Sequence, residues 1–177
     1  MVVAGPPCSG KSSLARALAS ELLVHVQIDA VFDLLLPGSD RNPDDRLLAY
    51  EAGARLARVL LDHGRTPMVE CTYAWRRQRA TLANVVDEAT TSFRVVEVVT
   101  APEEAVRRYR LSPGHRATDL TERKVRERAE SYPSYSGALR LESATGTPTE
   151  LALEAARWLR DAPVPIEVQE WVAAGRA

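Results

Sequence analysis

The 177-residue sequence contains only two cysteines, Cys8 and Cys71, and no long apolar run. Two cysteines cannot build the disulfide framework of a small secreted domain, so a reducing cytoplasm is the simplest setting. No stretch approaches the roughly 20 apolar residues needed to span a bilayer. The first expected strand begins directly after Met1, which gives no indication of a signal peptide. The composition therefore predicts a cytoplasmic protein without a membrane anchor.

The sequence also lacks an excess of either charge. Lys and Arg total 23 and Asp and Glu total 24, which gives a net charge of −1. This balance supplies no global positive field for nucleic acid, although a local basic patch stays open. The three histidines are scattered without the spacing of metal ligands, so no zinc site is expected. The length suits one domain with a full core.

The strongest motif is GPPCSGKS at residues 5–12. Gly5, four further residues and then Gly10-Lys11-Ser12 match the phosphate-binding P-loop. A short β-branched run precedes the motif and is typical of a buried parallel strand. The residues after Lys11 place leucines on one helical face. Strand, glycine loop and helix therefore occur in the order that the motif requires.

The residue types of this loop predict how it binds phosphate. Gly5 and Gly10 allow backbone angles closed to other residues, so successive N–H groups can converge on an anion. The helix N-terminus adds a partial positive charge. We expect Lys11 to reach the β- and γ-phosphates and the Ser12 hydroxyl to bind Mg²⁺. The expected nucleotide contacts are Gly5, Pro6, Pro7, Cys8, Ser9, Gly10, Lys11, Ser12 and Ser13.

Apolar runs alternate with helical patterns along the rest of the chain. Four runs are expected to form further strands, at 24–28, 67–71, 93–99 and 137–143. Three helical patterns lie between or after them, at 44–64, 101–110 and 148–160. The first of these helices is long and amphipathic, with Gly64 expected at its C-terminus. This alternation predicts an α/β fold with a five-stranded parallel sheet and helices on both faces.

These motifs, in this order, resemble small P-loop kinases of the nucleoside-monophosphate-kinase-like fold. The resemblance is to the zeta-toxin, chloramphenicol phosphotransferase and polynucleotide kinase group. It depends on GPPCSGKS, IDAVFDLL, the helix at 44–64, MVECTY and an Arg-rich stretch at 107–128. It implies a three-layer P-loop kinase domain at 1–160 with a small helical lid at about 110–123. A C-terminal appendage at 161–177 would follow, and ATP and Mg²⁺ are the implied cofactors.

The resemblance also implies catalytic roles for two carboxylates. Asp29 matches the aspartate that faces the acceptor hydroxyl and acts as base, at the carboxyl end of a parallel strand. Asp29 could instead cap a helix beginning at Ala30, and Asp33, one turn on, is the reserve candidate. Glu70 matches the acid that holds the water shell of Mg²⁺, so Ser12 and Glu70 form the expected metal site. A solvent-facing acid at the strand end is the alternative for Glu70.

Arginines recur between residues 107 and 128, and Pro113-Gly114 interrupts them as in a mobile lid. By the resemblance, Arg110 and Arg116 would neutralise charge on the transferred phosphoryl group, and Arg107 would stack on adenine. Interleaved glutamates make a solvated, ion-paired helix face an equal alternative.

Two further sets of contacts are expected. The loop at 144–147, with Thr145 and Gly146, would approach the adenine, or would be an ordinary loop with Thr147 as the helix N-cap. The residues expected near the acceptor are Asp33, Arg46, Thr72 and Tyr73.

The sequence thus predicts an ATP-dependent kinase acting on a hydroxyl of a small molecule, such as a metabolite, an antibiotic or a nucleotide sugar. A 5′-hydroxyl polynucleotide kinase is the alternative, although acidic residues near the expected acceptor entrance disfavour nucleic acid. A non-catalytic nucleotide-binding regulatory module is the alternative of another class. Against it, Lys11, Ser12, Asp29 and Glu70 are all present. No motif identifies the acceptor or the oligomeric state.

Overall fold

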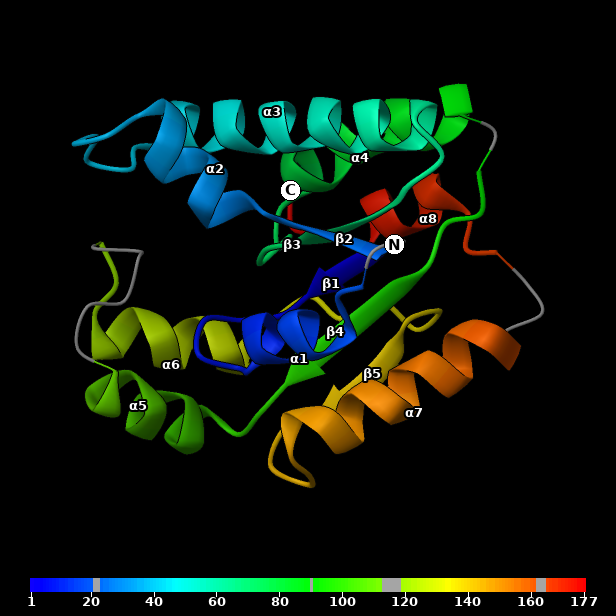
Figure 1. Ribbon diagram of the computed structural model, residues 1–177. Helices are drawn as coiled ribbons and strands as arrows, with labels where there is room; N and C mark the ends of the chain where they lie inside the picture. The colour runs from blue at the N-terminus through cyan, green and yellow to red at the C-terminus, as the bar shows by residue number, and fades with distance from the viewer. Residues whose placement is uncertain (21–22, 90, 113–118, 162–164) are drawn as a thin grey trace.

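The computed structural model describes residues 1–20, 23–89, 91–112, 119–161 and 165–177. Its centre is a five-stranded parallel sheet in the order β2-β3-β1-β4-β5 (Figure 1). The strands are β1 (Val2–Ala4), β2 (Leu23–Gln27), β3 (Thr66–Glu70), β4 (Val95–Val99) and β5 (Leu139–Glu142). The number of strands and their parallel arrangement confirm the prediction from the alternating pattern.

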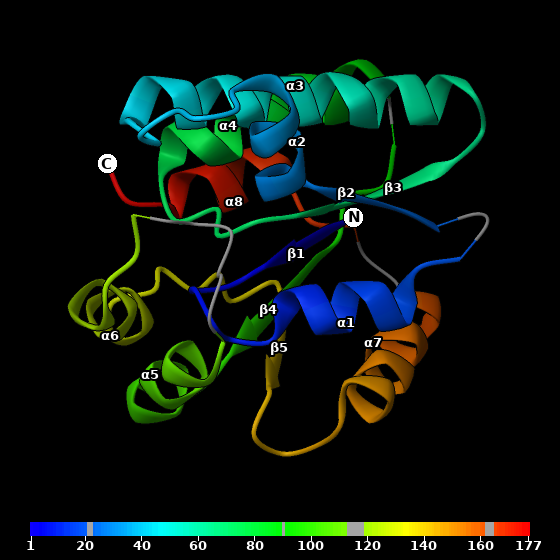
Figure 2. The same ribbon diagram turned by 60° about the vertical axis from the view of Figure 1, so that its left-hand side comes forward.

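Helices cover both faces of the sheet. They are α1 (Lys11–Leu18), α2 (Ile28–Leu35), α3 (Pro43–Asp62), α4 (Arg76–Ala89), α5 (Pro102–Leu111), α6 (Glu122–Glu130), α7 (Pro148–Asp161) and α8 (Val168–Ala173). In Figures 1 and 2, α2, α3, α4 and α8 lie on one side of the sheet, and α1 and α7 lie on the other. Among the described residues, no helix is long and apolar enough to cross a membrane.

The central strands divide their side chains between two cores. Successive residues of a strand point to opposite faces, so Val2 packs in the core under α3, α4 and α8. Val3 packs in the second core, with Leu14 of α1 and Leu151 of α7. All residues of β1 and β4 are buried, as expected for strands covered on both faces.

Local signals set the limits of α3, which carries much of the site. The Asn42 side chain caps the helix by accepting hydrogen bonds from the backbone N–H groups of Asp44 and Asp45, and Pro43 occupies the first turn. Gly64, with φ of 70°, follows the end of the helix. The helix therefore ends close to where the sequence predicts.

The C-terminal segment packs into the same core as α3. Trp171 of α8 is fully buried and contacts the rings of Tyr73 and Phe93, with centroids 5.3 and 5.1 Å away. The Arg79 guanidinium lies 5.1 Å from the centre of the Trp171 ring. The backbone N–H of Arg176 donates to the carbonyl oxygen of Ala74 over 2.9 Å. The last residues of the chain thus reach the loop that follows β3.

Candidate active site

The P-loop between β1 and α1 adopts backbone angles that suit anion binding. Gly5 has φ of 151°, and a Cβ atom there would lie 2.1 Å from the carbonyl oxygen of Val98. Gly10 has φ of 96° immediately before α1. Cys8 has φ of 60°, a left-handed conformation that is costly for a residue other than glycine. The α1 helix begins at Lys11 directly after the loop, and the N–H groups at a helix start carry a partial positive charge. The loop therefore forms a cradle for phosphate.

Lys11 lies next to a buried carboxylate at the end of β3. Its Nζ atom is 3.9 Å from Oε1 of Glu70 and 3.4 Å from the carbonyl oxygen of Pro6. Oε2 of Glu70 lies 3.4 Å from Nε2 of His25. Neither of those two buried atoms has a hydrogen-bond partner of regular geometry among the described residues. This arrangement leaves a carboxylate oxygen free for a cation or its water shell.

The electrostatics keep Glu70 ionised. Burial alone would raise its pKa, but the neighbouring His25 ring, the Lys11 charge and the Ser12 hydroxyl together outweigh burial and lower the pKa below its ordinary value. The side chains of Ser12 and Glu70, the expected metal ligands, therefore lie close together, and the Glu70 carboxylate carries a negative charge. Their oxygen donors suit Mg²⁺. Within the described ranges, no group of three or more His, Cys, Asp or Glu residues is arranged to hold a metal by itself.

Two cavities meet at Lys11. One, of about 500 Å³, is lined by Cys8, Gly10, Ser12 and Ser13 of the P-loop region and by Arg108, Ser143 and Gly146. The other, of about 290 Å³, lies toward α2 and α3 and is lined by Asp29, Arg46, Tyr50 and Thr72, among others. Lys11 lines both cavities. We call them the P-loop cavity and the Asp29 cavity.

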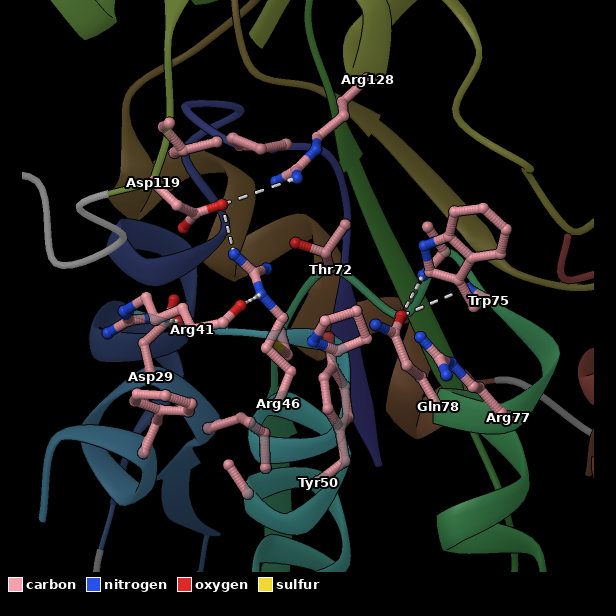
Figure 3. A pocket seen from close by; sticks show the side chains of 18 of the residues that line it. Asp29, Arg41, Arg46, Tyr50, Thr72, Trp75, Arg77, Gln78, Asp119 and Arg128 are labelled. Carbon is pink, nitrogen blue, oxygen red and sulfur yellow. Dashed lines mark hydrogen bonds and ion pairs between the residues drawn. The ribbon is translucent and has the colours of Figure 1, made fainter. Parts of the chain in front are cut away.

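The Asp29 cavity is built by elements from distant parts of the chain (Figure 3). Asp29 comes from α2, Arg46 from α3, Thr72 from the turn after β3, and Gln78 from α4. Arg128 enters from α6. Further lining residues include Trp75, Arg77, Asp119, Tyr132 and Arg176. The wall thus combines aromatic and apolar side chains with several charged groups.

Arg41 holds the Asp29 carboxylate in this cavity. Nη1 of Arg41 lies 2.9 Å from Oδ1 of Asp29, and Nη2 lies 2.6 Å from Oδ1 of Asp33. The α2 helix begins at Ile28 with Gln27 as its N-cap, so Asp29 lies in the first turn and does not cap the helix. The capping alternative for Asp29 is therefore wrong, and its carboxylate faces the cavity.

The other expected acceptor contacts fall in three places. Arg46 and Thr72 line the Asp29 cavity, whereas Asp33 is held by Arg41 and does not appear in its wall. Tyr73 differs from the expectation. Its φ of 49° turns the chain, and its ring is buried in the core between Tyr50 and Trp171. The backbone turn after Thr72 therefore takes the next side chain away from the cavity.

Arg107 and Arg110 of α5 fit the alternative of a solvated, ion-paired helix face. Arg107 is 61% exposed and pairs with Glu104, and Arg110 is 64% exposed and pairs with Glu122. Both carry the ion pairs of a solvated helix face. Arg116 and the middle of the expected lid, residues 113–118, lie outside the described residues.

The loop after β5 forms the expected N-cap of α7 at Thr147. The Thr147 hydroxyl accepts a bond from the Glu150 N–H over 3.3 Å, and the Glu150 carboxylate accepts one from the Thr147 N–H over 2.7 Å. This reciprocal pair is a capping box. Gly146 lines the P-loop cavity, while the Thr145 hydroxyl donates to the carbonyl oxygen of Glu142.

Sequence reasoning missed several residues at the site. Arg108 donates to the carbonyl oxygen of Ser9 over 3.2 Å and to the Ser143 hydroxyl over 2.7 Å, which places it against the P-loop. Its spacing of four residues from Glu104 is the same as that of many surface pairs, so no local signal separates it from Arg107. Arg41 and His25 were missed because their partners come from other elements.

The fold and the site define a nucleotide-binding P-loop protein with a kinase-like α/β fold. A family model described as an AAA domain matches residues 1–134, and the chain belongs to this family. A search of curated proteins found no match.

Solved structures share this fold along nearly their whole length. A sugar kinase from a Janibacter species, in its unliganded form, is 20% identical, with a TM-score of 0.67 over 99% of this chain and 97% of that one. The APS kinase of Mycobacterium tuberculosis, in complex with AMPPNP and APS, is 22% identical, with a TM-score of 0.68 over 90% and 97%. Shikimate kinase from Acinetobacter baumannii, in complex with shikimate, is 15% identical, with a TM-score of 0.63 over 92% and 94%.

Proposed function

We propose that the protein is an ATP-dependent kinase that transfers the γ-phosphoryl group to a hydroxyl of a small molecule. The observation that carries this proposal is the position of Lys11 in the walls of two cavities. A transferase of this kind needs a donor site and an acceptor site that meet at the phosphoryl group, and an ATP hydrolase needs no second organic pocket. The P-loop cavity is the donor site, and the Asp29 cavity is the acceptor site.

The donor site uses the P-loop and the groups around it. Backbone N–H groups of the loop and Lys11 bind the phosphates, and Ser12 with Glu70 holds Mg²⁺ and its water. Arg108 lies against the loop and is a further candidate for a phosphate contact. ATP supplies the γ-phosphoryl group when bound, and the metal ion compensates the negative charge of the phosphates. Gly146 lines the same cavity and fits a contact with the base.

The acceptor site uses Asp29 as its base. The carboxylate orients the acceptor hydroxyl and accepts its proton as the new bond to phosphorus forms. Arg41 fixes the direction of this carboxylate through the 2.9 Å contact. Arg46 and Thr72 contribute further acceptor contacts from the same cavity. On the family resemblance, we assign Arg110 and Arg116 in the lid at about 110–123 to contacts with the transferred group, which for Arg110 requires its ion pair with Glu122 to open.

The similar structures support this assignment. They are kinases of a sugar, of APS and of shikimate, and the structures of the last two contain APS and shikimate. The kinase domain that we propose spans residues 1–160, with the C-terminal segment completing the acceptor wall. Cys8 and Cys71 are both free, which suits a cytoplasmic enzyme.

A transfer screen tests the proposal. Purified protein, ATP and Mg²⁺ are incubated with pools of hydroxylated metabolites, nucleosides, antibiotics and oligonucleotides, and products are detected by a mass increase of one phosphoryl group. We expect transfer to a small molecule, and loss of that transfer in Lys11→Met. Transfer to water alone, or to none of the pools by a protein that binds ATP, would contradict the proposal.

A further inference from the structure

The Asp29 cavity carries more positive than negative charge. Six cationic side chains lie in its wall, namely Lys11, Arg41, Arg46, Arg77, Arg128 and Arg176. Its carboxylates are Asp29 and Asp119. Arg41 is engaged with the first of these and with Asp33, and Lys11 lies near Glu70. For the other four arginines of the wall, Asp119 is the one remaining carboxylate there. The cavity is therefore positively charged, although the whole protein has a net charge of −1.

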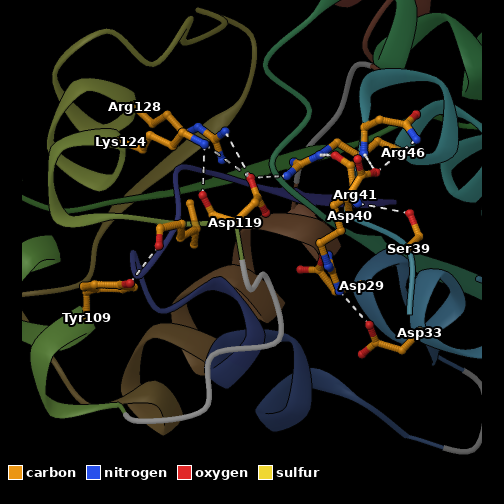
Figure 4. A network of polar contacts seen from close by, with 12 residues as sticks. Asp29, Asp33, Ser39, Asp40, Arg41, Arg46, Tyr109, Asp119, Lys124 and Arg128 are labelled. Carbon is orange, nitrogen blue, oxygen red and sulfur yellow. Dashed lines mark hydrogen bonds and ion pairs between the residues drawn. The ribbon is translucent and has the colours of Figure 1, made fainter. Parts of the chain in front are cut away.

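Asp119 receives three cations at the same oxygen atom (Figure 4). Arg46 forms an ion pair with its Oδ2 atom. Nζ of Lys124 and Nη2 of Arg128 each lie 3.9 Å from that atom. One carboxylate cannot neutralise three neighbouring cations, so the group retains a positive charge. Burial, and then the positive charge of Arg46, lower the pKa of Arg128.

Contacts within the protein hold two of these arginines, Arg46 and Arg176. Nε of Arg46 donates to the carbonyl oxygen of Arg41 over 2.6 Å. Arg176, from the last residues of the chain, donates to the Ser131 hydroxyl over 2.6 Å and lies 5.7 Å from the centre of the Trp75 ring. Like charges kept this close cost stability, and that cost is offset when an anion binds between them.

We propose that Arg46, Arg128 and Arg176 form a subsite for an oxyanion on the acceptor, a carboxylate or a phosphate, within the cavity that holds Asp29. Guanidinium groups bind such oxyanions through paired hydrogen bonds. The volume of about 290 Å³ suits a small hydroxylated acid or phosphate ester. This proposal rests on the proposed function, because the anion belongs to an acceptor only if the protein is a kinase. Binding of an anion to the subsite can nevertheless be measured without phosphoryl transfer.

The first experiment measures anion binding directly. The protein is saturated with Mg²⁺ and a non-hydrolysable ATP analogue, which occupies the P-loop, and is titrated with inorganic phosphate and separately with malonate at constant ionic strength. We expect a saturable rise in melting temperature with at least one of the two anions. The phosphate and malonate arms show which oxyanion the subsite prefers.

Two matched variants locate the binding. Arg128→Gln removes a guanidinium from the subsite, and Arg123→Gln removes one from the same helix, where the side chain is 76% exposed and pairs with Glu127. We expect anion affinity to fall about tenfold or more in Arg128→Gln and to stay unchanged in Arg123→Gln. An equal response in both variants, or no saturable response in the wild-type protein, would overturn the proposal.

The second experiment separates this proposal from the kinase assignment. Matched acceptors, glycerol with glycerate and a hexitol with its hexonate, are compared by kcat/KM in the wild-type protein and in Arg128→Gln. Preference for the acids, lost in Arg128→Gln, supports the subsite. Equal kcat/KM for the acids and their neutral counterparts in the wild-type protein, or a preference for the acids that persists in Arg128→Gln, overturns the subsite and leaves a kinase. Anion binding that depends on Arg128 without transfer to any acceptor leaves the subsite and contradicts the kinase.

Discussion

Arg41 Nη1 lies 2.9 Å from Oδ1 of Asp29, and the same guanidinium group reaches Asp33 with its other terminal nitrogen over 2.6 Å. Arg41 itself is buried, stacks on Phe32 at 4.4 Å, and has φ of 59°. A non-glycine residue held in this conformation indicates that the surrounding contacts fix its position. Asp29 and Asp33 therefore share one arginine, but of these two carboxylates only that of Asp29 lines the Asp29 cavity.

This relationship makes Asp33 a matched control for Asp29. We expect Asp29→Asn to lower kcat by roughly 10²–10⁴-fold, because the amide cannot accept the proton of the acceptor hydroxyl. The dissociation constant of ATP should change little, since the P-loop binds it. Asp33→Asn removes a similar charge from Arg41 and should keep kcat within about a few-fold. Equal losses of kcat in the two variants would show that kcat depends on the orientation of Arg41 and not on proton transfer to Asp29.

Arg108 and Arg107 both pair with Glu104, but only Arg108 reaches the P-loop and Ser143. We expect Arg108→Gln to weaken ATP binding about tenfold, the effect of losing a charge-assisted bond worth about 1.4 kcal/mol. Arg107→Gln should leave it unchanged because that side chain is exposed. Calorimetric titration with an ATP analogue measures both. A larger effect in Arg107→Gln would instead favour its stacking on adenine.

The buried Glu70 predicts a change of stability with pH. Its pKa in the folded protein is lower than the ordinary value of 4.5, so the ionised form stabilises the fold above that pH. The stabilisation falls as the pH drops from about 4.5 through the lowered pKa of the folded state. We expect wild-type protein to be more stable than Glu70→Gln at pH 7, with the difference shrinking toward pH 3. Urea unfolding across this range measures it, and a constant difference would contradict the prediction.

Substitution of Trp171 tests whether the C-terminal segment contributes to the stability of the core. The side chain is fully buried against Tyr73, Phe93 and Arg79, so Trp171→Ala should lower the free energy of unfolding by about 3–5 kcal/mol. Trp75 is 41% exposed, and Trp75→Ala should cost less than about 1 kcal/mol. Equilibrium unfolding in urea compares the two variants. Similar small losses would mean that α8 contributes little to the stability of the sheet.

Local sequence patterns were sufficient to predict the P-loop and the elements on either side of it. The P-loop, the strand before it and the helix after it lie within 18 residues, so sequence spacing alone specifies their arrangement. The β-branched runs of β1 and β4 are buried on both faces, as such runs indicate. Asp29 lies just after β2 and Glu70 is the last residue of β3, and the carboxyl ends of parallel strands share one edge.

The Asp29 cavity depends on contacts between residues far apart in the sequence, and the periodicity of single helices and strands does not reveal such contacts. Tyr73 follows Thr72 directly, yet a positive φ sends its ring into the core. Arg176 reaches the cavity from the end of the chain because Trp171 anchors α8 against α4. No helical or strand pattern encodes such a meeting, since it arises from the packing of whole elements.

The sequence by itself determined the α/β class, the number of strands and the phosphate-binding loop, because each follows from the order of neighbouring residues and from backbone preferences. Tertiary structure decided the strand order, the pairing of Asp29 with Arg41, and the convergence of Arg46 and Arg128 on Asp119. Those features require side chains from separate elements to meet, and only burial of the shared cores brings those elements together.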